Sequence, residues 1–130
     1  MISSFRYKQF LKAAQWIWAA FVFVIHVAPF DPERASRFDF PFADKWIHAI
    51  LFFLLAALSY LARDSKQESR QTMYWIIGLC ACYGGLLEWV QHTFTDERAG
   101  DVLDLAADLA GTFVGLMAAR IVERRLTPRS

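Results

Sequence analysis

The chain has 130 residues, of which 56% are hydrophobic and 21% are charged, and its formal net charge is +1 at pH 7. The hydrophobic share exceeds the ~45–50% of an average soluble domain, and the charges cluster between long apolar runs. A near-neutral charge without a glycine-rich phosphate loop, zinc-finger spacing or basic stripe predicts no nucleic-acid partner. The length suits a single domain over residues 1–130.

Four apolar segments follow one another along the chain, each close to the ~17–25 residues that a membrane-spanning helix needs. They run from Ala13 to Phe30, from Trp46 to Ala62, from Met73 to Val90 and from Val102 to Val122. The sequence therefore predicts an all-α fold, an integral membrane bundle of four transmembrane helices. The first segment could instead be a signal peptide, but its length and the lack of an A-x-A cleavage site favour a retained helix.

The basic residues predict the orientation of this bundle. Ten of them lie in the N-terminal segment, the second connection and the C-terminal tail, against four in the first and third connections. Because loops on the cytoplasmic side carry the excess of Lys and Arg, we expect both termini in the cytoplasm. The connections of residues 31–45 and 91–101 should then lie outside.

The two cysteines do not indicate a special site. Cys80 and Cys82 are two residues apart in an apolar run, so they point to different sides of a helix. We expect them to pack as small hydrophobic residues. The sequence predicts no disulfide between them, no metal ligands and no cofactor.

Polar residues inside the predicted helices share faces at helical spacing. The stripes are Asp44 and His48 in the second helix, Glu88, Gln91 and His92 in the third, and Asp101, Asp104, Asp108, Gly111 and Gly115 in the fourth. With the predicted orientation, all three stripes lie at one level in the outer half of the bilayer. A charged side chain at the bilayer centre costs about 2.5–3.5 kcal/mol on insertion scales, so we expect these acids to face inward.

Each stripe also has a purely structural interpretation. Asp101, and with it Asp104, could cap the fourth helix. Asp108 could be a neutral packing contact, and Glu88 with His48 could form a polar clamp between helices. Gly111-x-x-x-Gly115 is a small-residue packing motif, compatible with a homo-oligomer as well as with contacts inside one chain.

The order and spacing of these motifs resemble the VanZ-like membrane proteins, a family named after a protein associated with teicoplanin resistance. The resemblance covers residues 44–115 and rests on three blocks: Asp44-Lys45-x-x-His48-x-x-x-Phe52, Glu88-x-x-Gln91, and Arg98 followed by Asp104-x-x-x-Asp108-x-x-Gly111-x-x-x-Gly115. It implies a small helical bundle in the bacterial cytoplasmic membrane and a setting in cell-envelope metabolism or antibiotic resistance. Family members often have Asn at the position of Asp108.

The leading functional hypothesis is binding of a membrane lipid or lipid-linked cell-wall precursor in an outward-facing polar pocket. Its candidate ligand-binding residues are Asp44, Lys45, His48, Glu88, Gln91, Arg98, Asp104 and Asp108. Lys45 and Arg98 would contact phosphate or carboxylate groups, and the acids with His48 would bind sugars or amides. The alternatives are an enzyme acting on a lipid-linked substrate by acid–base or metal-assisted chemistry, a structural or partner-binding protein, and a small ion-coupled transporter. No catalytic residue is assigned.

Overall fold

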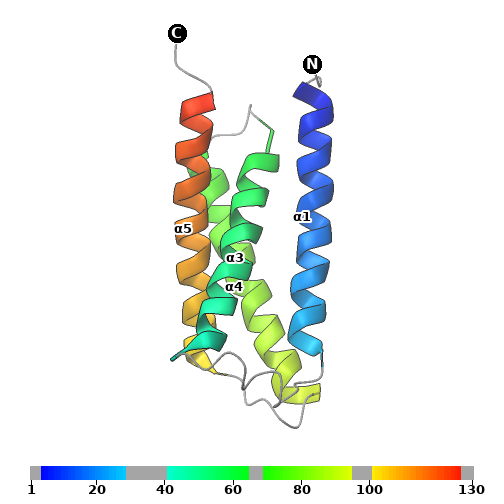
Figure 1. Cartoon of the computed structure of the whole chain (residues 1–130), viewed down its shortest axis with the longest axis vertical. Helices are drawn as coiled ribbons and strands as arrows, with labels where there is room; N and C mark the ends of the chain where they lie inside the picture. The colour runs from blue at the N-terminus through cyan, green and yellow to red at the C-terminus, as the bar shows by residue number, and fades with distance from the viewer. Residues whose placement is uncertain (1–3, 29–40, 65–68, 95–100, 127–130) are drawn as a thin grey trace.

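The computed structural model describes residues 4–28, 41–64, 69–94 and 101–126. They form four helices, α1 (Ser4–Val27), α3 (Ala43–Ala62), α4 (Ser69–Phe94) and α5 (Val102–Leu126). The helices run up and down in turn, so that α1 begins and α5 ends at the same end of the bundle (Figure 1). This end is called the terminal end below, and the opposite one the loop end.

All four helices are long and apolar enough to cross a membrane. The prediction of an all-α bundle with four transmembrane helices is confirmed, and the chain is a multi-pass membrane protein. The helices are longer than the predicted apolar segments, since α1 begins at Ser4 and α4 extends from Ser69 to Phe94. Backbone hydrogen bonding continues where the apolar run stops, because polar turns can remain helical at the membrane surface. Phe30, the predicted end of the first helix, lies outside the described residues.

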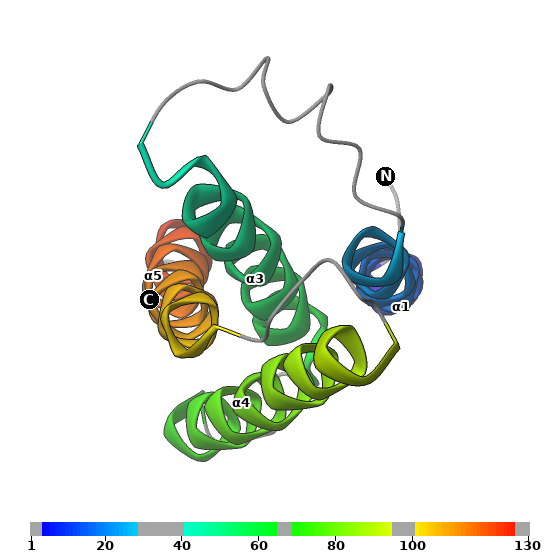
Figure 2. The same cartoon turned by 90° about the horizontal axis from the view of Figure 1, so that it is seen from below.

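Helix α3 takes the central position. It packs against α1, α4 and α5, and its contact with α5 is the most extensive in the bundle. Figure 2, which looks along the bundle from the loop end, shows α1 and α5 on either side of α3 and α4 across a third side. The glycine stripe of α5 faces α3, with Gly111 and Gly115 both buried.

The interior of the bundle is apolar over most of its length. Its fully buried large side chains include Val22 of α1, Phe52 of α3, Leu87 of α4 and Leu116 of α5. Large apolar side chains also cover the outside of every helix, among them Trp16, Ile50, Leu79 and Phe113. A soluble monomer seldom exposes so much contiguous apolar surface, and a lipid-facing surface accounts for it.

Candidate functional site

Lys45 is the centre of the polar cluster at the loop end. Its Nζ donates hydrogen bonds to Asp44 Oδ2 at 2.9 Å, Asp101 Oδ2 at 2.7 Å and Asp104 Oδ1 at 2.5 Å. The first turn of α3 places Lys45 toward α5, where Asp101 precedes the helix and Asp104 lies in its first turn. One ammonium group therefore holds three carboxylates and ties the starts of α3 and α5 together.

Asp101 combines this ion pair with the capping role that its position suggested. Its Oδ1 accepts a hydrogen bond from the backbone N–H of Leu103 at 2.9 Å, which confirms it as a helix cap. The hydrogen bond from Lys45, followed by the one from Leu103, holds the pKa of the Asp101 carboxyl below its usual value. Asp101 is thus an anion that belongs both to the helix start and to the cluster.

His48 and Asp108 form a buried pair one turn deeper in the bundle. His48 Nδ1 lies 2.9 Å from Asp108 Oδ1, and their side chains are 8% and 1% exposed. On the other side of the ring, His48 Nε2 lies 3.7 Å from Asp104 Oδ2, which is too long for a hydrogen bond. The imidazole of α3 is thus placed between two carboxylates of α5.

Glu88 of α4 approaches the cluster from a third helix. Its Oε2 accepts a hydrogen bond from the backbone N–H of Asp101 at 3.0 Å, while its Oε1 is buried without a hydrogen-bond partner among the described residues. A Cβ at Gly84, one turn earlier, would lie 2.8 Å from Asp108 Oδ2. The lack of a side chain at Gly84 thus leaves room for the Asp108 carboxylate beside α4.

The exposure of the acids falls steadily from the surface inward. The exposed fraction of the side chain is 64% for Asp44, 41% for Asp101, 14% for Asp104 and 1% for Asp108. A polar molecule at the membrane surface meets Asp44 and Asp101 first, and Asp104 behind them. The cluster is therefore accessible at Asp44 and Asp101 and closed at Asp108.

Acidic side chains outnumber basic ones in the cluster as the structure describes it. Asp44, Glu88, Asp101, Asp104 and Asp108 supply five carboxyl groups, and Lys45 is the ammonium group that contacts three of them. Charges removed from water are costly unless they are paired. The arrangement therefore favours a bound species that donates hydrogen bonds or carries positive charge.

Two of the predicted site residues are not part of the cluster as the structure describes it. Gln91 is buried and donates a hydrogen bond to the backbone oxygen of His26 at 3.0 Å, which joins α4 to α1. Arg98 lies outside the described residues. The other six candidates, Asp44, Lys45, His48, Glu88, Asp104 and Asp108, come together at the loop end.

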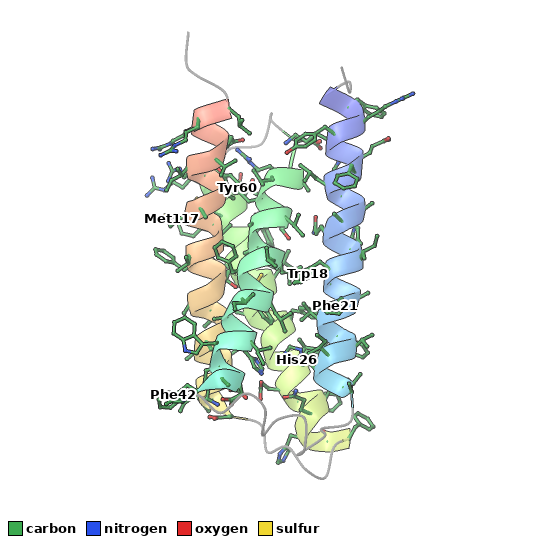
Figure 3. All side chains as sticks on the ribbon, viewed as in Figure 1. Trp18, Phe21, His26, Phe42, Tyr60 and Met117 are labelled. Carbon is green, nitrogen blue, oxygen red and sulfur yellow. The ribbon has the colours of Figure 1, made fainter. Side chains whose placement is uncertain are left out.

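His26 had no role in the sequence analysis, yet it borders the cluster. It is 2% exposed, its Nδ1 lies 2.7 Å from the backbone oxygen of Val22, and its ring meets that of His48 edge-on at 4.7 Å between centroids. Figure 3 shows it in the loop-end half of α1, on the side that faces the other helices. The sequence could have indicated this, because His26 lies late in an apolar helix, at the level of the other polar residues.

A second polar group, missed in the sequence, lies at the terminal end. Arg63 donates to Glu123 through Nη1 at 2.8 Å and Nη2 at 2.9 Å, and Tyr60 donates to the same carboxylate at 3.0 Å. The guanidinium also lies 4.1 Å from the centre of the Tyr60 ring. Glu123 continues the small-residue stripe of α5 through Ala119, which is the pattern that could have indicated it.

A cavity of about 510 Å³ opens in the terminal half of the bundle, away from the acidic cluster. Helices α1, α3 and α4 line it, with Trp16, Leu55, Ile76 and Leu79 on its apolar part. Its polar lining includes Lys12, Arg63 and Asp64. It is therefore not the outward-facing polar pocket expected between the three stripes.

Fold and cluster together define a small multi-pass membrane protein with an acidic polar group enclosed by its helices at one end. The chain belongs to the VanZ/LLP1 family, whose model matches residues 3–123, and the predicted resemblance is confirmed. It is also similar to an uncharacterized protein of the fission yeast Schizosaccharomyces pombe, with 30% identity over 91 residues that cover 70% of this chain and 55% of that protein. The match thus spans about half the length of the relative. No solved structure matches the chain.

Proposed function

We propose that this protein binds the polar headgroup of a membrane lipid or of a lipid-linked cell-wall precursor at the acidic cluster of its loop end. The observation that carries the proposal is the graded exposure from Asp44 and Asp101 to Asp104. It places hydrogen-bond acceptors where a headgroup at the membrane surface can reach them. Lys45 holds these acceptors in one arrangement before a ligand arrives, which lowers the entropy cost of binding.

The chemistry of the cluster favours a ligand rich in hydrogen-bond donors. Carboxylates accept hydrogen bonds from hydroxyl, amide and ammonium groups, and the sugars and peptides of cell-wall precursors offer all three. A direct phosphate contact by Lys45, which the sequence suggested, has less support because its ammonium group already contacts three carboxylates. In this proposal Lys45 organises the site, and the acids bind the ligand.

The biological setting is part of the same proposal. A bacterial cytoplasmic membrane with both termini inside would place the cluster at the outer surface, where cell-wall precursors are used. Binding there would let the protein act in the envelope or in a response to glycopeptide antibiotics such as teicoplanin. Membership of the VanZ/LLP1 family supports this setting.

The test is thermal unfolding of the full chain in lipid nanodiscs, with a panel of lipids and purified cell-wall lipid intermediates. A ligand at about 100 times its dissociation constant stabilises the folded state by about 2.7 kcal/mol. We expect one precursor class to raise the melting temperature of the wild type and of Asp64→Asn, an exposed acid at the terminal end. Asp104→Asn should lose the shift. An equal shift in all three proteins, or none in the wild type, would contradict the proposal.

Acid–base catalysis on a lipid-linked substrate is a second candidate, which one contact favours. Asp108 orients the ring of His48 at 2.9 Å, as the carboxylate does in many histidine general bases. Incubation of nanodisc-embedded protein with each precursor, followed by mass spectrometry, tests this candidate. Conversion that disappears in His48→Gln, while Asp64→Asn remains active, would support the enzyme over a binding protein.

A further inference from the structure

We propose that His48, Glu88 and Asp104 bind a divalent transition-metal ion and that Asp108 holds His48 in position for it. The three ligands come from α3, α4 and α5, and one ligand atom of each lies within 4.8 Å of the others. The proposal is independent of which lipid headgroup is bound. The sequence assigned no metal ligand, although it left metal-assisted chemistry open as an alternative.

The hydrogen bond of His48 leaves the correct nitrogen for a metal ion. With Nδ1 donating to Asp108 Oδ1 at 2.9 Å, the lone pair lies on Nε2, which makes no hydrogen bond with the described residues. Carboxylate–histidine–metal arrangements of this kind fix the ring and raise its basicity. Because His48 is 8% exposed and Asp108 is 1% exposed, this orientation is held inside the protein.

Asp104 presents one oxygen to the same space. Lys45 binds Oδ1, and Oδ2 lies 3.7 Å from His48 Nε2. Two ligands of one ion, each bonded at about 2.0–2.2 Å, lie roughly 3.0–3.5 Å apart. The observed separation is longer than a hydrogen bond and needs only a small side-chain rotation to match this geometry.

A buried oxygen atom of Glu88 supports the metal site independently of the distances between the ligands. Glu88 Oε1 is buried and has no donor among the described residues, and the same holds for Asp108 Oδ2. A buried carboxylate oxygen without a partner is costly. An ion bonded to Oε1 of Glu88 would supply the partner that this oxygen lacks.

The ligand set indicates which ions fit. An imidazole nitrogen with two carboxylates suits Mn²⁺, Fe²⁺ or Zn²⁺, whereas Mg²⁺ and Ca²⁺ prefer oxygen ligands alone. A second set of three possible ligands consists of His26, His48 and Asp108, whose ligand atoms also lie within 4.8 Å of one another. We place the ion at Nε2 because Asp108 already occupies Nδ1.

The experiment titrates the chelator-treated full chain in nanodiscs with Mn²⁺ and follows bound metal by electron paramagnetic resonance. We expect one Mn²⁺ per chain, with coupling of the electron spin to an imidazole nitrogen. Glu88→Gln should weaken binding at least tenfold. Asp108→Asn should weaken it about 10–100-fold, because Asp108 holds the ring of His48 in position without touching the ion. Asp64→Asn, which removes an exposed acid at the opposite end of the bundle, should leave the affinity within about twofold.

The wild-type spectrum keeps the test decisive even if a variant folds poorly. Stoichiometric Mn²⁺ with nitrogen coupling supports the site without any substitution. Absence of stoichiometric binding, or a bound ion without nitrogen coupling, would overturn it, as would equal loss of affinity in Glu88→Gln and Asp64→Asn. No lipid precursor is present, so a failed lipid experiment and a failed metal experiment are separate results.

Discussion

Gly111 of α5 lies directly on the backbone of Ala49 in α3. A Cβ built at Gly111 would overlap the carbonyl oxygen of Ala49, and one at Gly115 would overlap that of Phe53 in the next turn. Contacts to backbone atoms cannot be relieved by turning a side chain. The two helices can therefore approach this closely only because both positions are glycine, and the packing motif is used within the chain.

Gly111→Ala should destabilise the protein by roughly 1–3 kcal/mol, the range for overpacked sites. Gly78→Ala is the matched control, because a Cβ at Gly78 meets no atom within 4 Å. In the control, alanine should be neutral or stabilise by up to about 1 kcal/mol through helix propensity. Unfolding in mild detergent with increasing denaturant concentration measures the free energy of unfolding of both variants. Equal stability of the two variants would refute the close packing.

Replacing Lys45 with Met should leave Asp44, Asp101 and Asp104 without their shared cation. Because Lys45 is 19% exposed and Asp104 is 14% exposed, we expect a loss of about 2 kcal/mol or more. Adding Asp104→Asn to Lys45→Met should restore part of the loss, which a double-mutant cycle measures.

The control for Lys45 is Lys12, whose pair with Asp64 is 3.4 Å long and has 51% and 65% exposed side chains. An exposed pair of this kind contributes about 0–1 kcal/mol, so Lys12→Met should have little effect. If Lys12→Met cost as much as Lys45→Met, the cluster would not be a special site of charge compensation.

The Arg63–Glu123 pair should depend on the shape of the guanidinium as well as on its charge. Arg63→Lys keeps the charge but loses the two-pronged hydrogen bond and the stacking on Tyr60. We expect a loss of roughly 1–3 kcal/mol in the free energy of unfolding. Arg124→Lys on the exposed end of α5 is the control and should be neutral. No difference between the two variants would mean that the pair contributes little.

The predicted orientation can be tested with single cysteines in a Cys80→Ala, Cys82→Ala background. Asp44 and Asp64 have matched side-chain exposures of 64% and 65% but lie at opposite ends of the bundle. In intact bacterial cells, a membrane-impermeant maleimide should label Asp44→Cys and spare Asp64→Cys. Labelling with the opposite preference would reverse the orientation and place the acidic cluster at the cytoplasmic surface.

The ion pair of Asp101 gives the protein an acid-sensitive contact outside the membrane spans. Lys45 and the Leu103 amide lower the pKa of Asp101 when the protein is folded. Its stabilising contribution is therefore complete above the unfolded pKa of about 3.9 and is lost as the pH falls through the lower folded value. The ¹³C shift of the Asp101 carboxyl should therefore titrate at a lower pH in the wild type than in Lys45→Met.

The four spans and the level of the polar residues could be read from the chain alone. Apolar runs long enough to cross a membrane leave few alternatives to helices, because each backbone amide must be bonded within the lipid. The helical period then places Asp44 with His48, and Asp104 with Asp108, on common faces. Their gathering at one end follows from the alternating direction of consecutive spans.

Which polar groups meet was decided by the tertiary structure. Lys45 binds acids of α5, Gln91 turns to α1 beside His26, and Arg63 meets Glu123 sixty residues away. These pairings depend on the rotation of each helix about its axis. Because lipid is as apolar as the helix surfaces, hydrophobicity determines this rotation only weakly. Close approach at Gly111 and the pairing of buried polar groups determine it, and both require the neighbouring helices to be in place.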